Sequence, residues 1–409
     1  MDLTATLGLD PARALDPGRF AIAGRTPRAA LRPAGREELA EAVRAAAHEH
    51  LAVVPWGGGV GLARADAPTR YDLALDLTAL DRIVAYEPDD FTLTAECGVT
   101  LAMLAEAVAG RGQELPLECA HADRATFGGV LAANAVGPRR LRFGSPRDRV
   151  LGGHFVLGNG TAAKSGGRVV KNVAGYAIHR LLCGSRGALG ALVEATIKLA
   201  PAPHARLALV WTLDATRLAD GARDASLVRL EPAWWVVLGR DAARGITGLP
   251  DAPFVVVAGL EDDPGWVATQ RARFTGAFGA PHTSFESADA LALSRAIADR
   301  DASPTGGELA FASAHVTPAA LAPLLAEPEM ASCRFTATGG RLVVAVTEEH
   351  AGGFAARAHE AGFQWVERVA LAGFSPPLSP QSAVTALRAR IRSQLDPGGA
   401  FAFGERWSG

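Results

Sequence analysis

The chain of 409 residues is 49% hydrophobic and 21% charged, which is enough to bury more than one hydrophobic core. Its 41 basic and 43 acidic residues nearly balance, so no overall field attracts it to nucleic acid or to an anionic membrane. Four cysteines without a CxxC spacing indicate neither a disulfide framework nor a zinc or iron–sulfur site, and we expect a reducing, cytoplasmic location. No apolar run approaches the length of about 20 residues that a membrane-spanning helix needs, so we expect membrane contact only through partners.

Helical and strand patterns alternate over the first 110 residues. Apolar residues recur at three- and four-residue steps over 36–50, which predicts a helix with one buried stripe, and 51–54 reads as a short buried strand. Alternation of apolar and polar residues predicts strands over 71–77 and 91–96, and helical spacing returns over 101–109. Interleaved helices and strands favour an α/β or α+β architecture.

The strand at 51–54 leads into a loop with almost no side chains, Pro55–Gly61, which reads PWGGGVG. Such a loop offers several backbone N–H groups with nothing in front of them, as phosphate or pyrophosphate binding requires. The alternative is a glycine-rich surface turn. The loop lacks the GK[ST] ending of a Walker motif, and Leu62 stands where GxGxxG needs its third glycine.

A second glycine pattern, GxGxxA at Gly158–Ala163, must be weighed as a dinucleotide-binding fingerprint. The residues after it cannot sustain the helix that would hold a pyrophosphate, and no acidic residue stands about 20 positions on. The Asn159-Gly160 pair between apolar stretches at 154–157 and 161–164 instead predicts a hairpin with positive φ at both turn residues.

The stretch Thr126–Asn134 is rich in small residues, which favours either close approach of backbone to a ligand or tight helix packing. Three arginines follow within four positions, at 139, 140 and 142. This cluster suits either a solvated face or a phosphate site, and the sequence leaves both open.

Pro201 and Pro203 mark a probable domain boundary, after which strands and amphipathic helices alternate more simply. We predict a second α+β domain with strands at 207–213, 234–238, 254–258, 309–316, 334–337, 342–346 and 363–369, and with helices at 265–278, 288–299 and 354–361. A final helix over 382–395 ends where Asp396-Pro397-Gly398-Gly399 stops it.

The order of PWGGGVGLA, ATFGGVLAANAVGPRRLRFGSPRDRVLG, GGRVVKNVAGY and GSRGALGALVEATIKL resembles the FAD-binding domain of the vanillyl-alcohol oxidase/para-cresol methylhydroxylase (PCMH) superfamily. More narrowly, Phe20–Pro33 and the KNVAGY segment resemble the FAD-binding E subunit of bacterial glycolate oxidase. The resemblance covers about the first 200 residues and the tail Leu395–Trp407.

This resemblance implies an α+β protein with a two-lobed PCMH-type FAD-binding domain at 1–203 and a smaller α+β cap domain at 204–380. The lobes would be about 1–80 and 81–203, and a C-terminal helix and tail at 381–409 would pack back on the FAD-binding domain. Carried over by position, the FAD-binding residues would be Trp56, Gly57, Gly58, Gly59, Val60, Gly61, Leu62, Thr126, Phe127, Gly128, Gly129, Ala132, Ala133, Asn134, Gly137, Arg140, Gly144, Gly187, Leu192, Val193 and Ile197.

Three departures from the family bear on function. Many relatives attach FAD through a histidine in the first loop, but 56–62 contains none, so we expect non-covalent FAD. Catalytic 2-hydroxyacid relatives carry an HGDGNxH-like metal motif in the cap, whereas here His315 stands alone, and we expect no metal. Ala177 replaces the aspartate that follows KNVAGY in the family, with an effect that the sequence does not reveal.

The resemblance therefore implies an FAD-binding subunit of a glycolate oxidase complex, with a catalytic flavosubunit and an iron–sulfur subunit as partners. The chain would be cytoplasmic, or peripheral at the inner membrane through the complex. Two alternatives stay open: a free-standing FAD-dependent oxidase of a sugar acid or alcohol, and a non-catalytic scaffold. The substrate, the stoichiometry and the role of Lys171 are not fixed by the sequence, and no catalytic residue is assigned.

Overall fold

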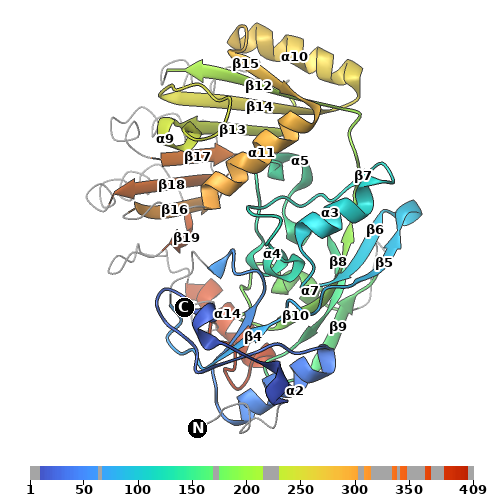
Figure 1. Ribbon diagram of the computed structural model, residues 1–409, viewed down its shortest axis with the longest axis vertical. Coiled ribbons are helices and arrows are strands. Elements are labelled where there is room, and N and C mark those ends of the chain that lie inside the picture. Colours follow the sequence, from blue (N-terminus) through green and yellow to red (C-terminus); the bar gives the residue numbers. More distant parts are fainter. Residues whose placement is uncertain are drawn as a thin grey trace.

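The computed structural model describes residues 10–62, 67–168, 175–214, 230–302, 308–314, 334–338, 341–347, 364–369 and 382–403. Figure 1 shows an eight-stranded sheet with its helices at one end of the molecule and two smaller sheets at the other. We call the part that holds the smaller sheets, residues 10–201, the N-terminal unit. The part that holds the eight-stranded sheet, residues 205–369, is the cap unit.

The first lobe of the N-terminal unit is a four-stranded sheet in the order β1-β2-β4-β3. Helix α2, Arg36–His48, packs on it through a stripe that includes Leu39, Val43 and Ala46, all fully buried. The negative charges of Glu37 and Glu38 in its first turn stabilise the helix by interacting with the positive end of its dipole. The strands are β1 (Ala14–Leu15), β2 (Ala29–Leu31), β3 (Val53–Trp56) and β4 (Leu73–Asp76), with short 3₁₀ helices η1 (Pro11–Arg13) and η2 (Pro17–Phe20) before β2.

The second lobe is a five-stranded antiparallel sheet in the order β5-β6-β10-β8-β9, covered by short helices. Its core joins apolar residues of the sheet, of α3 and of α4 in one cluster. The elements are β5 (Ile83–Glu87), η4 (Pro88–Asp90), β6 (Thr92–Glu96), α3 (Leu101–Ala109), α4 (Phe127–Ala133), α5 (Arg140–Phe143), α6 (Pro146–Arg149), β8 (Val150–Val156), β9 (Ala162–Gly166), α7 (Ile178–Leu182) and β10 (Ala191–Lys198). A separate small ladder pairs β7 (Gln113–Glu114) with β11 (Ala200–Pro201).

The predicted hairpin is confirmed, but its turn differs from the predicted one. Strands β8 and β9 pair antiparallel with Val156 opposite Ala162, which leaves a five-residue connection. Gly160 has a φ of +78°, whereas Asn159 keeps a negative φ, and its side-chain Oδ1 accepts a hydrogen bond from the N–H of Thr161 at 3.0 Å. The longer turn needs positive φ only at glycine, so Asn159 acts through its side chain.

The cap unit is an antiparallel sheet in the order β15-β12-β14-β13-β17-β18-β16-β19 with helices on both faces. On one face, Trp211 and Trp235 stack on Phe274 of α10 at ring-centroid distances of 5.9 Å, and on the other, strand residues pack with Leu293 and Ile297 of α11. The elements are β12 (Ala205–Leu213), β13 (Trp234–Gly239), α9 (Arg240–Ala243), β14 (Phe254–Asp262), α10 (Pro264–Phe278), β15 (Thr283–Glu286), α11 (Ser287–Ala302), β16 (Glu308–Ala314), β17 (Arg334–Thr338), β18 (Arg341–Thr347) and β19 (Gln364–Val369).

All seven predicted cap strands and two of its predicted helices are present, because long apolar runs and amphipathic periods carry those signals. The sequence analysis missed β15 and, in the N-terminal unit, the strands β1, β2, β5, β7, β10 and β11, of which β10 follows a glycine-rich stretch. The predicted helix at 354–361, His315 and Lys171 lie outside the described residues. The domain limits at 203 and 380 stay a prediction.

The C-terminal segment returns to the N-terminal unit. Helix α14, Ser382–Leu395, is followed by a turn in which the buried Asp396 carboxylate accepts backbone N–H groups of Ala400 (2.7 Å) and Phe401 (3.2 Å). Backbone hydrogen bonds then join Ala400 and Ala402 to Val53 of β3, and Phe401 enters the core of the first lobe. The tail thus packs beside the strand that leads into the glycine loop.

We predict that Asp396→Ala lowers the free energy of unfolding by about 2 kcal/mol, because two buried N–H groups would lose a charged acceptor. Urea denaturation of the purified chain measures this change. Asp16 is the matched control, since its carboxylate accepts the N–H of Gly18 at 2.9 Å on an exposed turn. Equal effects of Asp16→Ala and Asp396→Ala would contradict a special role for the tail.

Candidate functional site

The glycine loop that follows β3 lies directly against the segment before α4. A side chain at Gly57 would collide with the hydroxyl of Thr126, and one at Gly58 would collide with the backbone carbonyl of Arg124. Gly59 has a φ of +74° and stands over the indole of Trp56. These glycines are therefore required by the close approach of two backbone segments, whatever ligand the loop also binds.

Gly61 differs from its neighbours in the loop. It is exposed, and a Cβ built on it would meet nothing nearer than the Cβ of Ala133 at 4.0 Å. The space in front of Gly61 is open on the side of the loop that faces α4. This is where a ligand backbone or phosphate has room to lie against bare backbone.

Helix α4 is the element that the predicted binding segments surround. Thr126 caps it by accepting the N–H of Gly129 at 3.3 Å, and Gly128 packs so closely on Cys97 that a Cβ would lie 2.6 Å from the cysteine Cβ. For Gly128 the helix-packing interpretation of the small residues is therefore correct. Asn134 ends the helix in the left-handed conformation, with φ of +48°.

A third segment closes the far end of α4. The N–H of Gly184 donates to Leu131 O at 3.1 Å, and the N–H of Arg186 donates to Ala132 O at 2.8 Å. Gly187, with φ of +76°, lies 3.4 Å from Pro55 at the start of the glycine loop, measured from its ideal Cβ position to Pro55 Cδ. Segments around residues 57, 128 and 186 thus converge, although they are far apart in the sequence.

The predicted residues of β10 are brought near this cluster only at the start of the strand. The carbonyl of Val193 accepts the N–H of Cys97 at 2.8 Å, and the carbonyl of Cys97 accepts the N–H of Gly128 at 2.7 Å. Leu192 is buried beside it in the same sheet. Ile197 lies five residues after Leu192 along β10, roughly 16 Å from it, and its side chain is fully buried in the core.

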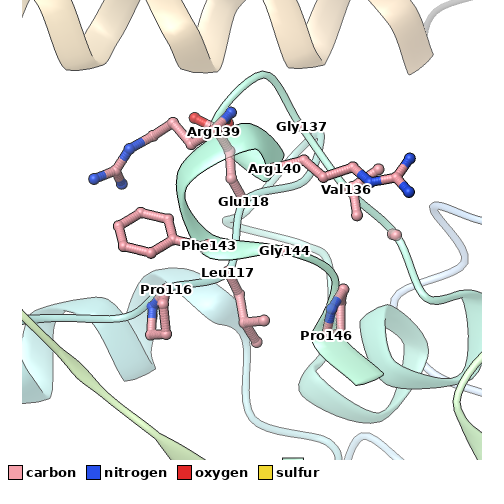
Figure 2. A pocket seen from close by; sticks show the side chains of 11 residues that line it. Pro116, Leu117, Glu118, Val136, Gly137, Arg139, Arg140, Phe143, Gly144 and Pro146 are labelled. Atoms are coloured by element: carbon pink, nitrogen blue, oxygen red, sulfur yellow. The ribbon is translucent and has the colours of Figure 1, made fainter. Parts of the chain in front are cut away.

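The predicted residues Gly137, Arg140 and Gly144 line a small, partly open hollow in the N-terminal unit. Figure 2 shows the side chains of this pocket, with Arg139 and Arg140 pointing in opposite directions. Gly137 approaches Glu118 so closely that a Cβ would lie 2.6 Å from the carboxylate Oε2, and Gly144 has a φ of +74°. The lining residues are Pro116, Leu117, Glu118, Ala135, Val136, Gly137, Arg139, Arg140, Phe143, Gly144 and Pro146.

Arg139 has a role that neither interpretation of the arginine cluster anticipated. Its guanidinium is buried, with the side chain 5% exposed, and donates to both oxygens of Glu261 on β14 and to Glu114 Oε2, with shortest distances of 2.7 Å to each residue. Arg206 also donates to Glu114 Oε2, at 2.8 Å. Burial opposes the charge, but Glu261 and Glu114 outweigh it and raise the pKa of Arg139. Arg139 is thus an interface residue and belongs neither to a solvated face nor to a phosphate site.

Glu118 is a buried carboxyl group that joins the pocket to the cap unit. Its Oε2 accepts the backbone N–H of Arg139 at 2.8 Å, and its Oε1 accepts the hydroxyl of Ser294 on α11 at 2.6 Å. Burial raises the pKa of Glu118, although the nearby Arg139 and the hydrogen bond from Ser294 work against the shift. No local pattern marks Glu118 as a functional residue, because its partner Ser294 is 176 positions away.

Within the described ranges, no group of three or more His, Cys, Asp or Glu side chains is placed to hold a metal ion. In the same part of the chain, no helix combines the length and the apolar character that crossing a membrane requires. Ala177 precedes α7, where His179 Nδ1 lies 2.9 Å from the hydroxyl of Ser165.

Residues 27–166 match a family described as FAD binding domain. FAD is the cofactor of this chain. The matched range contains the glycine loop, α4 and the pocket, and it ends at the last residue of β9. The room at Gly61 fits an extended phosphate-bearing cofactor, because bare backbone is available there and the nearest protein atom to a Cβ would be 4.0 Å away.

The chain is similar to several proteins of known name. Glycolate oxidase subunit GlcE of Escherichia coli (strain K12) is 43% identical over 136 residues, which cover 33% of this chain and 39% of the relative. Glycolate oxidase subunit GlcD of Bacillus subtilis (strain 168) is 30% identical over 246 residues, covering 58% of this chain and 52% of the relative. D-2-hydroxyglutarate dehydrogenase of Xanthomonas citri pv. viticola is 35% identical over 171 residues, 42% of this chain and 36% of the relative. The chain thus spans about half, or less, of the length of these curated relatives.

Among solved structures, alkyldihydroxyacetonephosphate synthase matches with a TM-score of 0.65 at 14% identity, over 92% of this chain and 76% of that one. Such a likeness concerns the fold alone. It confirms the predicted α+β fold class of PCMH type, and the family match confirms the predicted FAD. The individual FAD-binding residues stay a prediction.

We predict that Gly61→Val weakens FAD binding about tenfold or more while leaving the free energy of unfolding of the apoprotein nearly unchanged. The new side chain would enter the open space at the loop, where it meets ligand and no protein. Titration of the apoprotein with FAD, followed by flavin fluorescence, measures the Kd.

Gly276→Val is the control, since Gly276 is exposed on α10 and also has open space around it. Gly58→Val would not serve, because it collides with Arg124 and damages the fold. Unchanged FAD affinity in Gly61→Val would place the cofactor elsewhere.

We predict that the contributions of Glu118 and Glu96 to folding stability depend on pH in opposite directions. Because the folded pKa of Glu118 is raised, its contribution to stability is present at low pH and lost as the pH rises above about 4.3. The pKa of Glu96 is lowered by its hydrogen bond to Arg82, so its contribution is present at neutral pH and lost as the pH falls. The stability difference between wild type and Glu118→Gln should shrink from pH 4 to 7, roughly the range over which carboxyl groups titrate.

The corresponding difference for Glu96→Gln should grow over the same range, as measured by denaturant unfolding at each pH. If the stability difference from wild type changed with pH in the same direction for both variants, a raised pKa of the buried Glu118 would be contradicted.

Proposed function

We propose that this chain is the FAD-binding subunit, of the GlcE kind, in a complex that oxidises glycolate or a related 2-hydroxyacid. The observation that carries the proposal is that two glycine segments of the region matching the FAD binding domain converge around α4 with a third segment at residues 184–187. The match to a GlcE subunit at 43% identity supports this kind of subunit over a different FAD-dependent oxidase.

The chain's own residues hold and orient the cofactor in this proposal. The loop of residues 56–62, the segment of residues 126–134 and Gly187 would bind FAD non-covalently along the pyrophosphate and adenine parts, with Leu192 and Val193 nearer the adenine end. Ile197, buried in the core farther along β10, is left out of this site. Gly137, Arg140 and Gly144 would shape the channel at the pocket, where Arg140 adds a positive charge. FAD supplies two-electron acceptor chemistry when bound.

Oxidation of glycolate to glyoxylate releases two electrons and two protons, which a complex must pass to separate acceptors. The chain would be an enzyme subunit of FAD-dependent oxidoreductase type that carries these electrons toward an iron–sulfur partner. The names of the two glycolate oxidase relatives, both subunits, support membership of a complex. Its partners in this proposal would be a catalytic flavosubunit and an iron–sulfur subunit. In this proposal the complex is cytoplasmic, or peripheral at the inner membrane through its partners.

A second candidate is a free-standing FAD-dependent dehydrogenase of a D-2-hydroxyacid, favoured by the similarity to D-2-hydroxyglutarate dehydrogenase. A flavin-free scaffold is the third. The purified chain distinguishes them: we expect it to bind FAD and show flavin absorbance, but to reduce a dye acceptor with glycolate only when its partner chains are added.

Robust turnover of glycolate or another hydroxyacid by the chain alone would favour the second candidate and contradict the first. Failure to take up FAD after reconstitution would contradict both and leave the scaffold. Gly61→Val in the complete complex controls for flavin that belongs to the partner, because it should remove only the flavin of this chain.

A further inference from the structure

Within the described residues, four residues of the cap unit make hydrogen bonds to segments of the N-terminal unit that form or flank the pocket: Arg206, Glu261, Ser294 and Asp299. Glu261 on β14 binds the Arg139 guanidinium, and the carbonyl of Glu261 accepts a hydrogen bond from Arg142. Ser294 on α11 donates to Glu118, and Asp299 on the same helix accepts the N–H of His121 at 2.7 Å.

These contacts fall on only two segments of the N-terminal unit, residues 114–121 and residues 137–144. The two segments supply most of the pocket lining. They are also joined to each other, because Glu118 accepts the N–H of Arg139 and Glu114 binds its guanidinium. Figure 1 shows α5, within the second segment, beside the cap sheet and next to α11.

Two of the crossing contacts, Glu261 with Arg139 and Ser294 with Glu118, are deeply buried. The side chains of Arg139 and Glu261 are 5% and 2% exposed, and Ser294 is fully buried. Loss of one partner leaves a buried charge or acceptor without compensation, which costs far more than loss of an exposed ion pair. The position of the cap therefore constrains the shape of the two pocket segments.

We propose that Glu261 and Ser294 of the cap unit are positioning residues for the FAD pocket: they hold segments 114–121 and 137–144 in the shape that binds the flavin, so that cap docking and FAD affinity are coupled. The inference rests on the proposed FAD site, since it assumes that the pocket forms part of it. By linkage, bound FAD must in turn stabilise the docked cap.

The test changes only cap residues, so any effect on the cofactor must cross the interface. We expect Glu261→Gln to raise the Kd for FAD about tenfold and Ser294→Ala about threefold. Both variants should also alter the visible circular dichroism of bound flavin, because the asymmetric surroundings of the ring change. FAD titration of each folded apoprotein and its spectrum at saturation give the two readouts.

Asp251→Asn is the matched control. The Asp251 carboxylate makes a 3.3 Å ion pair with Arg240 of the same unit, and the Asp251 side chain is 71% exposed. This variant should leave the Kd and the spectrum unchanged. If Glu261→Gln does not fold, the milder Ser294→Ala decides the question.

An unchanged Kd and spectrum in both interface variants would overturn the coupling while leaving the FAD site intact. A wild-type chain that binds no FAD would instead overturn the proposed function. If the variants lose stability but bind FAD as wild type does, the contacts are structural only and the inference is wrong.

Discussion

A buried guanidinium cannot lose its carboxylates without leaving an unpaired charge in a poorly solvated place, and this constraint joins the two units of the molecule. Arg139 lies between Glu114 of its own unit and Glu261 of the cap, and Arg206 shares Glu114 from the other side. The charges sit where β14 meets the loop before α5. Each charged side chain of this group is paired with another, and the pairs cross between the two units. These buried pairs constrain how the cap unit packs on the pocket segments.

The glycines of the N-terminal unit serve two purposes that only the structure separates. Gly57, Gly58 and Gly128 are small because another part of the protein occupies the place of a side chain. Gly61 differs, because a Cβ there would reach no protein atom nearer than 4.0 Å, which leaves room for a phosphate-bearing cofactor. The match of residues 27–166 to the FAD binding domain covers both kinds. Substitutions at the second kind test binding, whereas substitutions at the first test folding.

Local patterns predicted much of the fold, since the helices at residues 36–48 and 101–109 and the strands of the cap follow from apolar periodicity. The Asn-Gly pair likewise located the hairpin, though not its turn. Contacts between distant residues carry no such local signal. The partner of Arg139 is 122 positions away and that of Glu118 is 176 away, so an arginine cluster read locally was assigned to solvent or phosphate. Strand β10, in the glycine-rich stretch around residue 190, was not predicted for a similar reason. Its pairing partners are the distant strands β6 and β8.

The proposed cofactor site lies in the N-terminal unit, and contacts from the cap unit hold part of it. Hydrogen exchange measured with and without FAD tests the coupling between FAD binding and cap docking most directly. This coupling predicts that FAD slows exchange in the glycine loop and α4, and also in segments 114–121 and 137–144 and in the cap elements β14 and α11 that hold them. Protection confined to the glycine loop and α4, with the interface and the cap unchanged, would contradict the account.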